Sequence, residues 1–369
     1  MKLVVFGLSI SSSWGNGHAT VLRGLFRALA AQSHQVTFFE KDVPYYASHR
    51  DLTHLLGLKL DLYSDWRTAR PKAEAALEDA DVAMVTSYCP DGIAATELVL
   101  QSRGATVFYD LDTPVTLARL ARGEQLTYIG QRGLADFDLV LSFTGGPALQ
   151  ALRSQLGAGR TLPLYGSADP EVHRPVRRVA GYQSDLSYLG TYSEDRQETL
   201  DQLLLEPARR APQQKFIIGG ATYPEVFPWT SNIYFVRHLP PTEHAAFYSS
   251  SRVTLNVTRR PMKQMGFCPS GRLFEAAACG VPILSDEWPG LDQFFLPETE
   301  IVIVRSAEDV LSALQLPQQA LDRIAAAARV RVLREHTAEV RAREFETALQ
   351  SVWSDRPGKN SVRADAVRA

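Results

Sequence analysis

Short runs of apolar residues alternate with amphipathic segments along most of the chain. Continuous apolar runs of roughly four to eight residues are typical of buried parallel strands, and apolar positions three or four apart are typical of helices. In the first half this pattern predicts strands at residues 3–8, 36–40, 58–63, 82–86, 105–109, 139–142 and 161–164. It predicts helices at residues 18–31, 68–77, 92–101, 114–119 and 145–156. The alternation indicates a doubly wound parallel sheet.

The pattern breaks once and then restarts. Residues 166–184 hold Gly, Pro, Asp and Arg with little periodicity, so we place a domain boundary there. Further strands are expected at residues 186–189, 215–218, 233–235, 253–257, 281–284 and 301–304. Further helices are expected at residues 194–205, 242–249, 272–279, 307–314, 318–334 and 338–352. The predicted fold class is α/β, with two doubly wound Rossmann-like domains at residues 1–168 and 169–353 and a disordered tail at 354–369.

The composition is that of a globular protein and gives no sign of nucleic-acid binding or of a membrane span. The 369 residues are 45% hydrophobic and 22% charged, which is ordinary for a globular protein, and the net charge of -2 gives no footprint for nucleic acid or an anionic membrane. No window reaches ~18 uninterrupted apolar residues, so no transmembrane segment is expected. The three cysteines, Cys89, Cys268 and Cys279, have no CxxC spacing, and we expect a reducing, cytoplasmic location.

Residues 256–286 are the stretch most suggestive of chemistry, because they read as strand, loop, short helix and strand. We expect residues 259–270 to form an exposed loop, and Ser270, Gly271 and Arg272 to start the helix. A helix start at the carboxyl edge of a parallel sheet offers free N–H groups to an anion. Glu275, one turn later, is placed to accept hydrogen bonds from sugar hydroxyls. The combination suits a nucleoside diphosphate with its ribose, although an ordinary buried helix has the same spacing.

The loop between the first strand and the first helix is the second candidate. It is not GxGxxG, but glycines there permit close approach of the backbone to a ligand. We expect its last residue, His18, to project toward the second domain as a candidate general base. The alternative is a helix-capping loop with a solvated histidine. The predicted lining residues are Trp14, Gly15, Asn16, Gly17 and His18.

Two later strand ends also carry polar residues. Asp110 and Asp112 form a DxD, which chelates a divalent metal in some glycosyltransferases, but such short matches are frequent by chance and we expect no metal. Asp112 precedes Thr113 and Pro114, so helix capping is its alternative role, and Asp110 is the better functional candidate. The turn at Gly145 suits a sugar or phosphate about as well as a plain strand-to-helix turn.

The second half of the chain also holds cations and histidines that could bind a ligand. Arg259 ends a predicted strand, where it can neutralise charge on a leaving diphosphate. Arg196 lies in the first turn of a predicted helix, where a surface position is the ordinary role of an arginine. His238 and His244 match no compact zinc spacing, so we expect no metal ligands there.

The stretch RLFEAAACGVPILSD resembles the donor-binding signature of GT-B glycosyltransferases. A closer similarity is to CgeB-like (spore-maturation-type) members, through SWGNGHAT, FYDLDTPVTL, SFTGGP, YLGTYSEDRQ, LNVTR and PSGRLFEAAACG. The resemblance implies two domains facing across a cleft, the first on the acceptor side and the second binding the nucleotide sugar. It also implies that the last helix crosses back to the first domain.

The resemblance implies roles for particular residues. Glu275 would hold the ribose hydroxyls, His238 would contact the nucleobase, and His18 would be a base oriented by Asp110. Retaining members carry a second Glu eight residues before the first, where this chain has Phe267. They also bind the diphosphate through an Arg and a Lys, at whose places this chain has Thr191 and Arg196.

The predicted function is metal-independent transfer of a sugar from a nucleotide-diphosphate-sugar donor to an acceptor hydroxyl or similar nucleophile. No cofactor is expected, and the acceptor is a glycan, a protein or a small molecule. Two alternatives stay open, a sugar-nucleotide epimerase of the same architecture and a non-catalytic nucleotide or sugar binder. Stereochemistry stays open as well, because His18 favours inversion while the Glu275 signature resembles retaining families.

Overall fold

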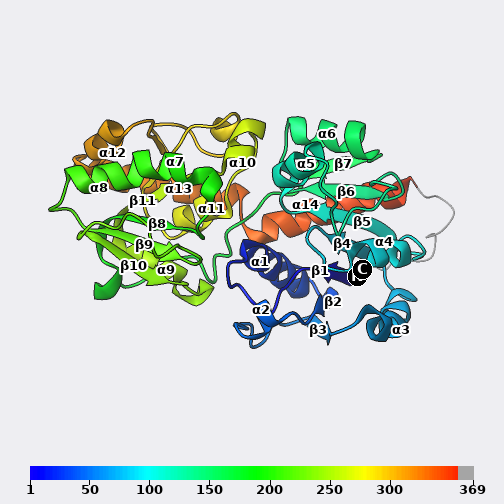
Figure 1. Cartoon of the computed structure of the whole chain (residues 1–369). Coiled ribbons are helices and arrows are strands. Elements are labelled where there is room, and N and C mark those ends of the chain that lie inside the picture. Colours follow the sequence, from blue (N-terminus) through cyan, green and yellow to red (C-terminus); the bar gives the residue numbers. More distant parts are fainter. Residues whose placement is uncertain (356–369) are drawn as a thin grey trace.

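The computed structural model describes residues 1–355, which form two parallel α/β domains side by side (Figure 1). The first sheet has seven parallel strands in the order β3-β2-β1-β4-β5-β6-β7. Its strands are β1 (Lys2–Gly7), β2 (Gln35–Lys41), β3 (Leu58–Tyr63), β4 (Val82–Thr86), β5 (Ala105–Asp110), β6 (Leu139–Ser142) and β7 (Thr161–Pro163). Its helices are α1 (Gly17–Ala31), α2 (Pro44–Ala47), α3 (Trp66–Leu77), α4 (Gly92–Val99), α5 (Thr113–Ala121) and α6 (Pro147–Leu156).

The second sheet has six parallel strands in the order β10-β9-β8-β11-β12-β13. Its strands are β8 (Ser184–Leu189), β9 (Phe216–Gly220), β10 (Ile233–Arg237), β11 (Ser251–Asn256), β12 (Ile283–Ser285) and β13 (Val302–Ile303). The helices of the second half are α7 (Gln197–Leu200), α8 (Glu206–Arg210), α9 (Pro241–Ser250), α10 (Arg260–Met265), α11 (Gly271–Ala278), α12 (Ala307–Leu314), α13 (Gln318–Glu335) and α14 (Ala338–Ser354). Short 3-10 segments lie at Ala180–Tyr182, Glu194–Arg196 and Leu291–Gln293, and a π-helical turn spans Asp201–Leu205.

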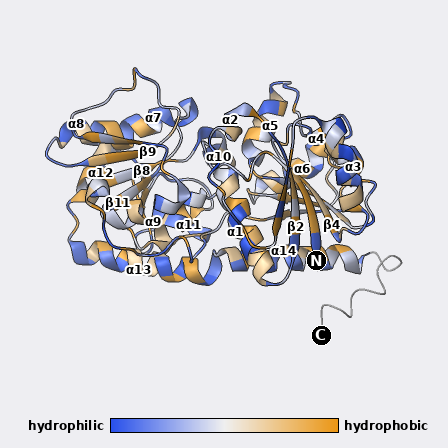
Figure 2. Cartoon of the chain, turned by 90° about the horizontal axis from the view of Figure 1, so that it is seen from below, coloured by the Kyte–Doolittle hydropathy of each residue, from blue (hydrophilic) through white to orange (hydrophobic). Residues whose placement is uncertain are grey.

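The predicted fold class is confirmed, because both halves are parallel sheets wound with helices. The strands appear in Figure 2 as apolar layers between helices of mixed character, as continuous apolar runs require. The domain limits at 168 and 353 stay a prediction, although the strands of the first sheet end at Pro163 and those of the second begin at Ser184. The predicted tail falls almost wholly outside the described residues.

One predicted loop is partly wrong. Residues 259–270 contain helix α10, because Pro261 lies in its first turn, where the missing N–H of proline costs nothing. Met262 of this helix packs against the core of the first domain, so the segment belongs to the junction between the domains.

The last helix returns to the first domain, as the resemblance implied. In Figure 1 the orange-red helix α14 lies with the blue and cyan domain, and it packs against α1, β5 and β6. Phe345 and Leu349 of α14 are fully buried in the first core. The chain therefore passes between the domains twice, and the two passages are hydrogen-bonded, from Ala168 N–H to His336 O (2.9 Å) and from Ala338 N–H to Ala168 O (2.8 Å).

No helix of residues 1–355 is long and apolar enough to cross a membrane.

Candidate active site at the domain junction

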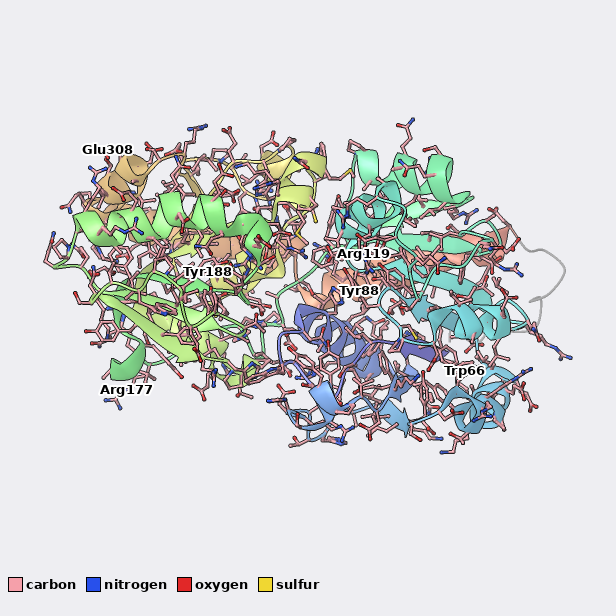
Figure 3. The ribbon with its side chains drawn as sticks, in the orientation of Figure 1. Trp66, Tyr88, Arg119, Arg177, Tyr188 and Glu308 are labelled. Atoms are coloured by element: carbon pink, nitrogen blue, oxygen red, sulfur yellow. The ribbon has the colours of Figure 1, made fainter. Side chains whose placement is uncertain are left out.

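Each sheet has a point where its strand order reverses direction, between β1 and β4 in the first domain and between β8 and β11 in the second. Ligands of open parallel sheets bind at the carboxyl ends of the strands beside such points. The loop after β1 leads into α1, whose first turn carries His18, and the loop after β4 carries Tyr88. The loop after β8 carries Thr191, and the residues after β11 include Arg259. Figure 3 labels Tyr88 in the first domain and Tyr188, on β8, in the second.

His18 lies in the first turn of α1, half-buried beside Tyr88, with 5.4 Å between the ring centroids. Its Nδ1 is buried and has no hydrogen-bond partner within residues 1–355. Burial, with a smaller contribution from the positive charge of Arg259, lowers the pKa of His18 to about 4. At neutral pH the ring is therefore uncharged and can accept a proton, as a general base must.

Asp112 joins the two domains through Arg259. Its Oδ2 accepts a hydrogen bond from the Tyr88 hydroxyl (3.0 Å) and one from Arg259 Nη1 (3.3 Å). Burial raises the pKa of Asp112 to about 6, against the opposing effect of Arg259. Arg259 also donates to Asp195 within the second domain, with 2.9 Å between Nε and Oδ2. One guanidinium is thus shared by two carboxylates at the junction.

Asp110, predicted to orient His18, makes its hydrogen bonds within its own turn. Asp110 is completely buried, and its Oδ1 accepts bonds from the N–H of Asp112 and the hydroxyl of Thr116, both 3.1 Å. None of its hydrogen bonds in the described chain reaches His18. Through these bonds the carboxyl of Asp110 fixes the turn after β5, whereas Asp112 faces the second domain. Burial raises the pKa of Asp110 to about 6.

A buried carboxylate shapes the loop before His18. Glu40, at the end of β2, is fully buried and accepts hydrogen bonds from Ser9 Oγ (2.9 Å), Ile10 N–H (2.7 Å), and both Ser11 N–H (2.9 Å) and Ser11 Oγ (2.5 Å). Asn16 then donates to the carbonyl of Ser9 (2.9 Å). These bonds hold the loop against the strand edge, so the predicted lining residue Asn16 shapes the loop from within.

Trp14 is the part of that loop that reaches the second domain. Its ring lies between His49 of the first domain (centroids 3.9 Å apart) and His238 of the second (4.2 Å). Gly15 follows with φ +59°, and Gly17 begins α1. His238, predicted to contact a nucleobase, therefore packs against Trp14 in this conformation, with the two rings tilted by 41°.

Three arginines of the second domain converge at the carboxyl edge of its sheet. Arg196 is almost fully buried, donates to the carbonyl of Thr191 (3.1 Å), and has an Nε without a partner in the described chain. Burial lowers the pKa of Arg196, and the charges of Arg272 and Arg259 lower it further. Arg196 and Arg272 have no carboxylate partner in the described chain, and such buried like charges favour binding of an anion beside them.

Arg272 differs from the prediction in its immediate contacts. It donates to the carbonyls of Leu189 (2.6 Å) and Val257 (3.2 Å) and to Ser270 Oγ (3.0 Å). Its guanidinium also lies over the ring of Tyr188, 5.5 Å from the centroid. Most of its donors therefore tie the strand ends to the start of α11, and its remaining contribution to an anion is its charge.

Glu275 lies within α11 beside two histidines that the sequence did not associate with it. Its Oε2 is 3.3 Å from His244 Nδ1 and 4.0 Å from His173 Nε2. Burial acts to raise the pKa of Glu275, but His173, His244 and Arg272 outweigh it and lower the pKa to about 2. The other oxygen, Oε1, is 3.8 Å from where a Cβ would stand at Gly271. One side of the carboxylate thus lies close to the two histidines, and the other faces the start of the helix.

The ligand atoms of His173, His244 and Glu275 lie within 4.8 Å of one another, which raises the question of a metal. The N–H of Asp169 donates to His173 Nδ1 (3.1 Å), so the proton of the neutral ring is on Nε2. Nε2 then has no lone pair to offer a cation, and a ligating histidine normally donates from its other nitrogen. The donor set does not fit a divalent cation.

Phe267 and Gly145 lie where the two domains touch. Gly145 N–H donates to the carbonyl of Phe267 (2.9 Å), and the Phe267 ring packs between Gly146 and Gly290. Phe267 has φ +50°, which is unusual for a residue with a side chain. Phe267 therefore occupies the position beside the Gly145 turn that was predicted for a sugar or phosphate.

Four further residues of the site were missed from sequence: Tyr88, Asp195, His173 and His244. Tyr88 carried one signal, since it lies two residues after a predicted strand, close to the end of the strand as Asp110 is. His173 lies 102 positions before Glu275 in the chain, and His244 lies 31 positions before it. Only the tertiary fold brings such groups together.

Comparisons with known proteins found a family model for part of the sequence and several solved structures with the same fold. Residues 196–347 match the family model described as "Glycosyl transferase-like". No curated protein matches the chain. Among solved structures, sucrose-phosphate synthase from Thermosynechococcus elongatus has a TM-score of 0.69 at 15% identity, covering 96% of this chain and all of that one.

Two further structures have similar scores. HepE from Anabaena, in complex with UDP and glucose, has a TM-score of 0.67 at 11% identity, with 95% of this chain and 100% of that chain covered. An α-glucosyltransferase in complex with UDP has a TM-score of 0.69 at 12% identity, with the same coverage. The chain thus has the two-domain GT-B fold, and its residues 196–347 are similar to the glycosyl transferase-like family model.

Proposed function

We propose that this protein transfers a sugar from a nucleoside-diphosphate sugar to an acceptor hydroxyl or similar nucleophile, without a metal. The observation that carries the proposal is the convergence of Arg196, Arg259 and Arg272 on the edge of the sheet where α11 begins. Guanidinium groups and a helix start are the elements that proteins use to bind phosphates. The structural relatives HepE and the α-glucosyltransferase were both solved with UDP, which supports a nucleoside diphosphate as the anion.

Glu275 supplies the second half of the donor site. A carboxylate with a pKa of about 2 is ionised throughout the physiological range, so it accepts hydrogen bonds and donates none. Its Oε1 faces the start of α11, where a diphosphate would lie. We therefore assign it to the ribose hydroxyls. Arg259 would exchange at least one of its carboxylate partners for the diphosphate as the donor binds.

The reaction forms a bond between the acceptor oxygen and the anomeric carbon, and breaks the bond from that carbon to the diphosphate. The acceptor proton passes to His18 in an inverting course or to the leaving diphosphate in a retaining one. If His18 is the base, His18→Ala should lower the rate by about 10²–10⁴-fold while nucleotide binding is unchanged. A loss below tenfold would assign the proton to the leaving group.

Three finer features belong to the same proposal. The sequence similarity to CgeB-like enzymes makes a surface glycan, a protein or a small molecule the expected class of acceptor. Burial of all three free cysteines is consistent with a reducing cytoplasm. Burial raises the pKa of Cys268 to about 12, so its thiol is protonated and is not proposed as a nucleophile.

The first experiment is calorimetric titration with UDP, GDP, ADP, TDP and CMP, with and without EDTA, on the native protein and on Glu275→Ala. We expect one diphosphate to bind regardless of EDTA, and Glu275→Ala to weaken that binding. Binding that requires a divalent cation would overturn metal independence. Failure of every nucleotide to bind would overturn the proposed donor site.

Product analysis separates the proposal from its alternatives. A transferase forms a glycosylated acceptor together with free nucleoside diphosphate. An epimerase would convert the donor without any acceptor, and a binding protein would bind the nucleotide but consume none.

A further inference from the structure

The two passages of the chain between the domains each place a buried histidine against α11. His173, in the first passage, approaches Glu275, and His336, in the second, packs on Phe274 with 4.6 Å between the ring centroids. Both imidazoles are therefore in contact with consecutive residues of the helix that begins the proposed donor site. The connection between the domains and the ribose-binding carboxylate are physically adjacent.

The ring of His173 is fixed in one orientation. The backbone N–H of Asp169 donates to His173 Nδ1 (3.1 Å). The backbone N–H of His173 donates to the carbonyl oxygen of Asp169 (2.6 Å). Nε2–H is consequently directed at Glu275 Oε2 from 4.0 Å, and it has no other partner in the described chain. A hydrogen bond needs about 3 Å, so a shift of roughly 1 Å would complete it.

Asp169 in turn is attached to the first domain. Its carboxylate pairs with Arg27 of α1, and its Cβ is 4.0 Å from where a Cβ would stand at Gly24 on the same helix. Asp169 is only 7% exposed, so this pair is shielded on one side. A continuous series of contacts thus runs from α1 of the first domain, through the connecting segment, to the carboxylate in the second domain.

We propose that His173 is a positioning residue for Glu275, and that Asp169 and Arg27 make donor affinity depend on how the first domain sits against the connecting segment. The inference rests on the proposed function, since it assigns Glu275 to the donor ribose. Movement of the connecting segment by about 1 Å toward α11 would bring Nε2–H into hydrogen-bonding distance of Oε2. Glu275 would then be held from one side, with Oε1 free for the ribose hydroxyls.

The other groups around His173 do not offer a competing acceptor. Glu275, His244, Arg27 and Asp169 are the charged or titratable groups that act on it or bond to it. Asp169 uses its carboxylate for Arg27 and for the N–H of Glu171 (3.0 Å). Burial lowers the pKa of His173 to about 4, so at neutral pH the ring is an uncharged donor through Nε2.

The test compares three variants by titration with the nucleoside diphosphate that the native protein binds, and by steady-state kinetics. His173→Leu removes the donor, whereas His173→Gln keeps an N–H group in a similar place. Arg27→Gln removes the contact from the first domain, far from any ligand. We expect His173→Leu to weaken binding about tenfold, Arg27→Gln to weaken it about threefold, and His173→Gln to restore most of the loss.

The kinetic readout separates positioning from general damage. Because only donor binding is affected, KM for the donor should rise while kcat at saturating donor stays within about twofold. Arg70→Gln is the matched control, since Arg70 forms an exposed ion pair with Glu74 on α3 of the first domain. If His173→Leu does not fold, Arg27→Gln carries the test, because its side chain is partly exposed.

The outcomes distinguish this inference from the proposed function. A native protein that binds no nucleoside diphosphate overturns both. A native protein that binds one, with His173→Leu and Arg27→Gln binding it equally well, overturns the positioning role alone. The role also fails if His173→Gln binds as weakly as His173→Leu.

Discussion

Arg259 forms ion pairs in both directions at the junction. It bonds to Asp112 of the first domain and to Asp195 of its own domain. Arg259→Gln leaves these carboxylates without their cation and removes one charge from the proposed diphosphate site. A charge-assisted hydrogen bond contributes about 1.5–3 kcal/mol, so donor affinity should fall roughly 10- to 100-fold. Calorimetric titration measures the loss. Arg260→Gln is the control, because Arg260 is exposed and pairs only with the exposed Glu198.

The pH dependence of kcat/KM should reflect the ionisation of Asp112, which pairs with Arg259 at the junction. The pKa of Asp112 is raised to about 6, so its carboxylate is charged, and can pair with Arg259, only above that pH. The pKa of His18 is lowered to about 4, so His18 remains unprotonated well below pH 6. We therefore expect kcat/KM of the native protein to decline as the pH falls through about 6.

Asp112→Asn provides the comparison, because an amide cannot titrate. Its profile should stay flat to lower pH and decline only toward the pKa of His18, near 4. A decline that remains at pH 6 in this variant would assign the titration to another group.

At the scale of single elements, α14 shows how the end of the chain stabilises its beginning. Phe345 is fully buried among residues of α1 and of the first sheet. Phe345→Ala should lower the free energy of unfolding by about 3–5 kcal/mol, the usual cost of removing a buried aromatic ring. Urea unfolding measures this loss. The exposed Gln350→Ala on the same helix should change stability by less than about 0.5 kcal/mol, and an equal effect of both would mean that α14 does not pack on the first domain in solution.

The elements were largely predictable from the sequence because their signals are local. Apolar runs located the strands, and the Ser270–Gly271 start located α11 and with it Glu275. Helix α10 was not foreseen, since Met262 gains its packing partners only from the first domain. The roles of Asp110 and Asp112 were exchanged for a similar reason. Both follow one strand, and only the position of the second domain decides which of them meets Arg259.

At the scale of the molecule, the two domains touch through several kinds of contact. There is a ring contact from Trp14 to His238, an ion pair from Asp112 to Arg259, and a backbone hydrogen bond from Gly145 to Phe267. The two chain passages are bonded at Ala168, so relative movement of the domains would turn about that point. Breaking the ring contact or the ion pair frees the junction without disturbing either core.

Trp14 gives the clearest test of that movement. Its ring is held between His49 and His238, so Trp14→Ala removes the ring contact between the domains and leaves both sheets intact. We expect a larger radius of gyration in small-angle scattering of the ligand-free variant. Because a less closed junction admits water, the ratio of donor hydrolysis to sugar transfer should rise at least severalfold. Trp229→Ala, at an aromatic cluster within the second domain, should change neither quantity. An unchanged radius and an unchanged hydrolysis ratio in Trp14→Ala would show that the ring contact does not control closure.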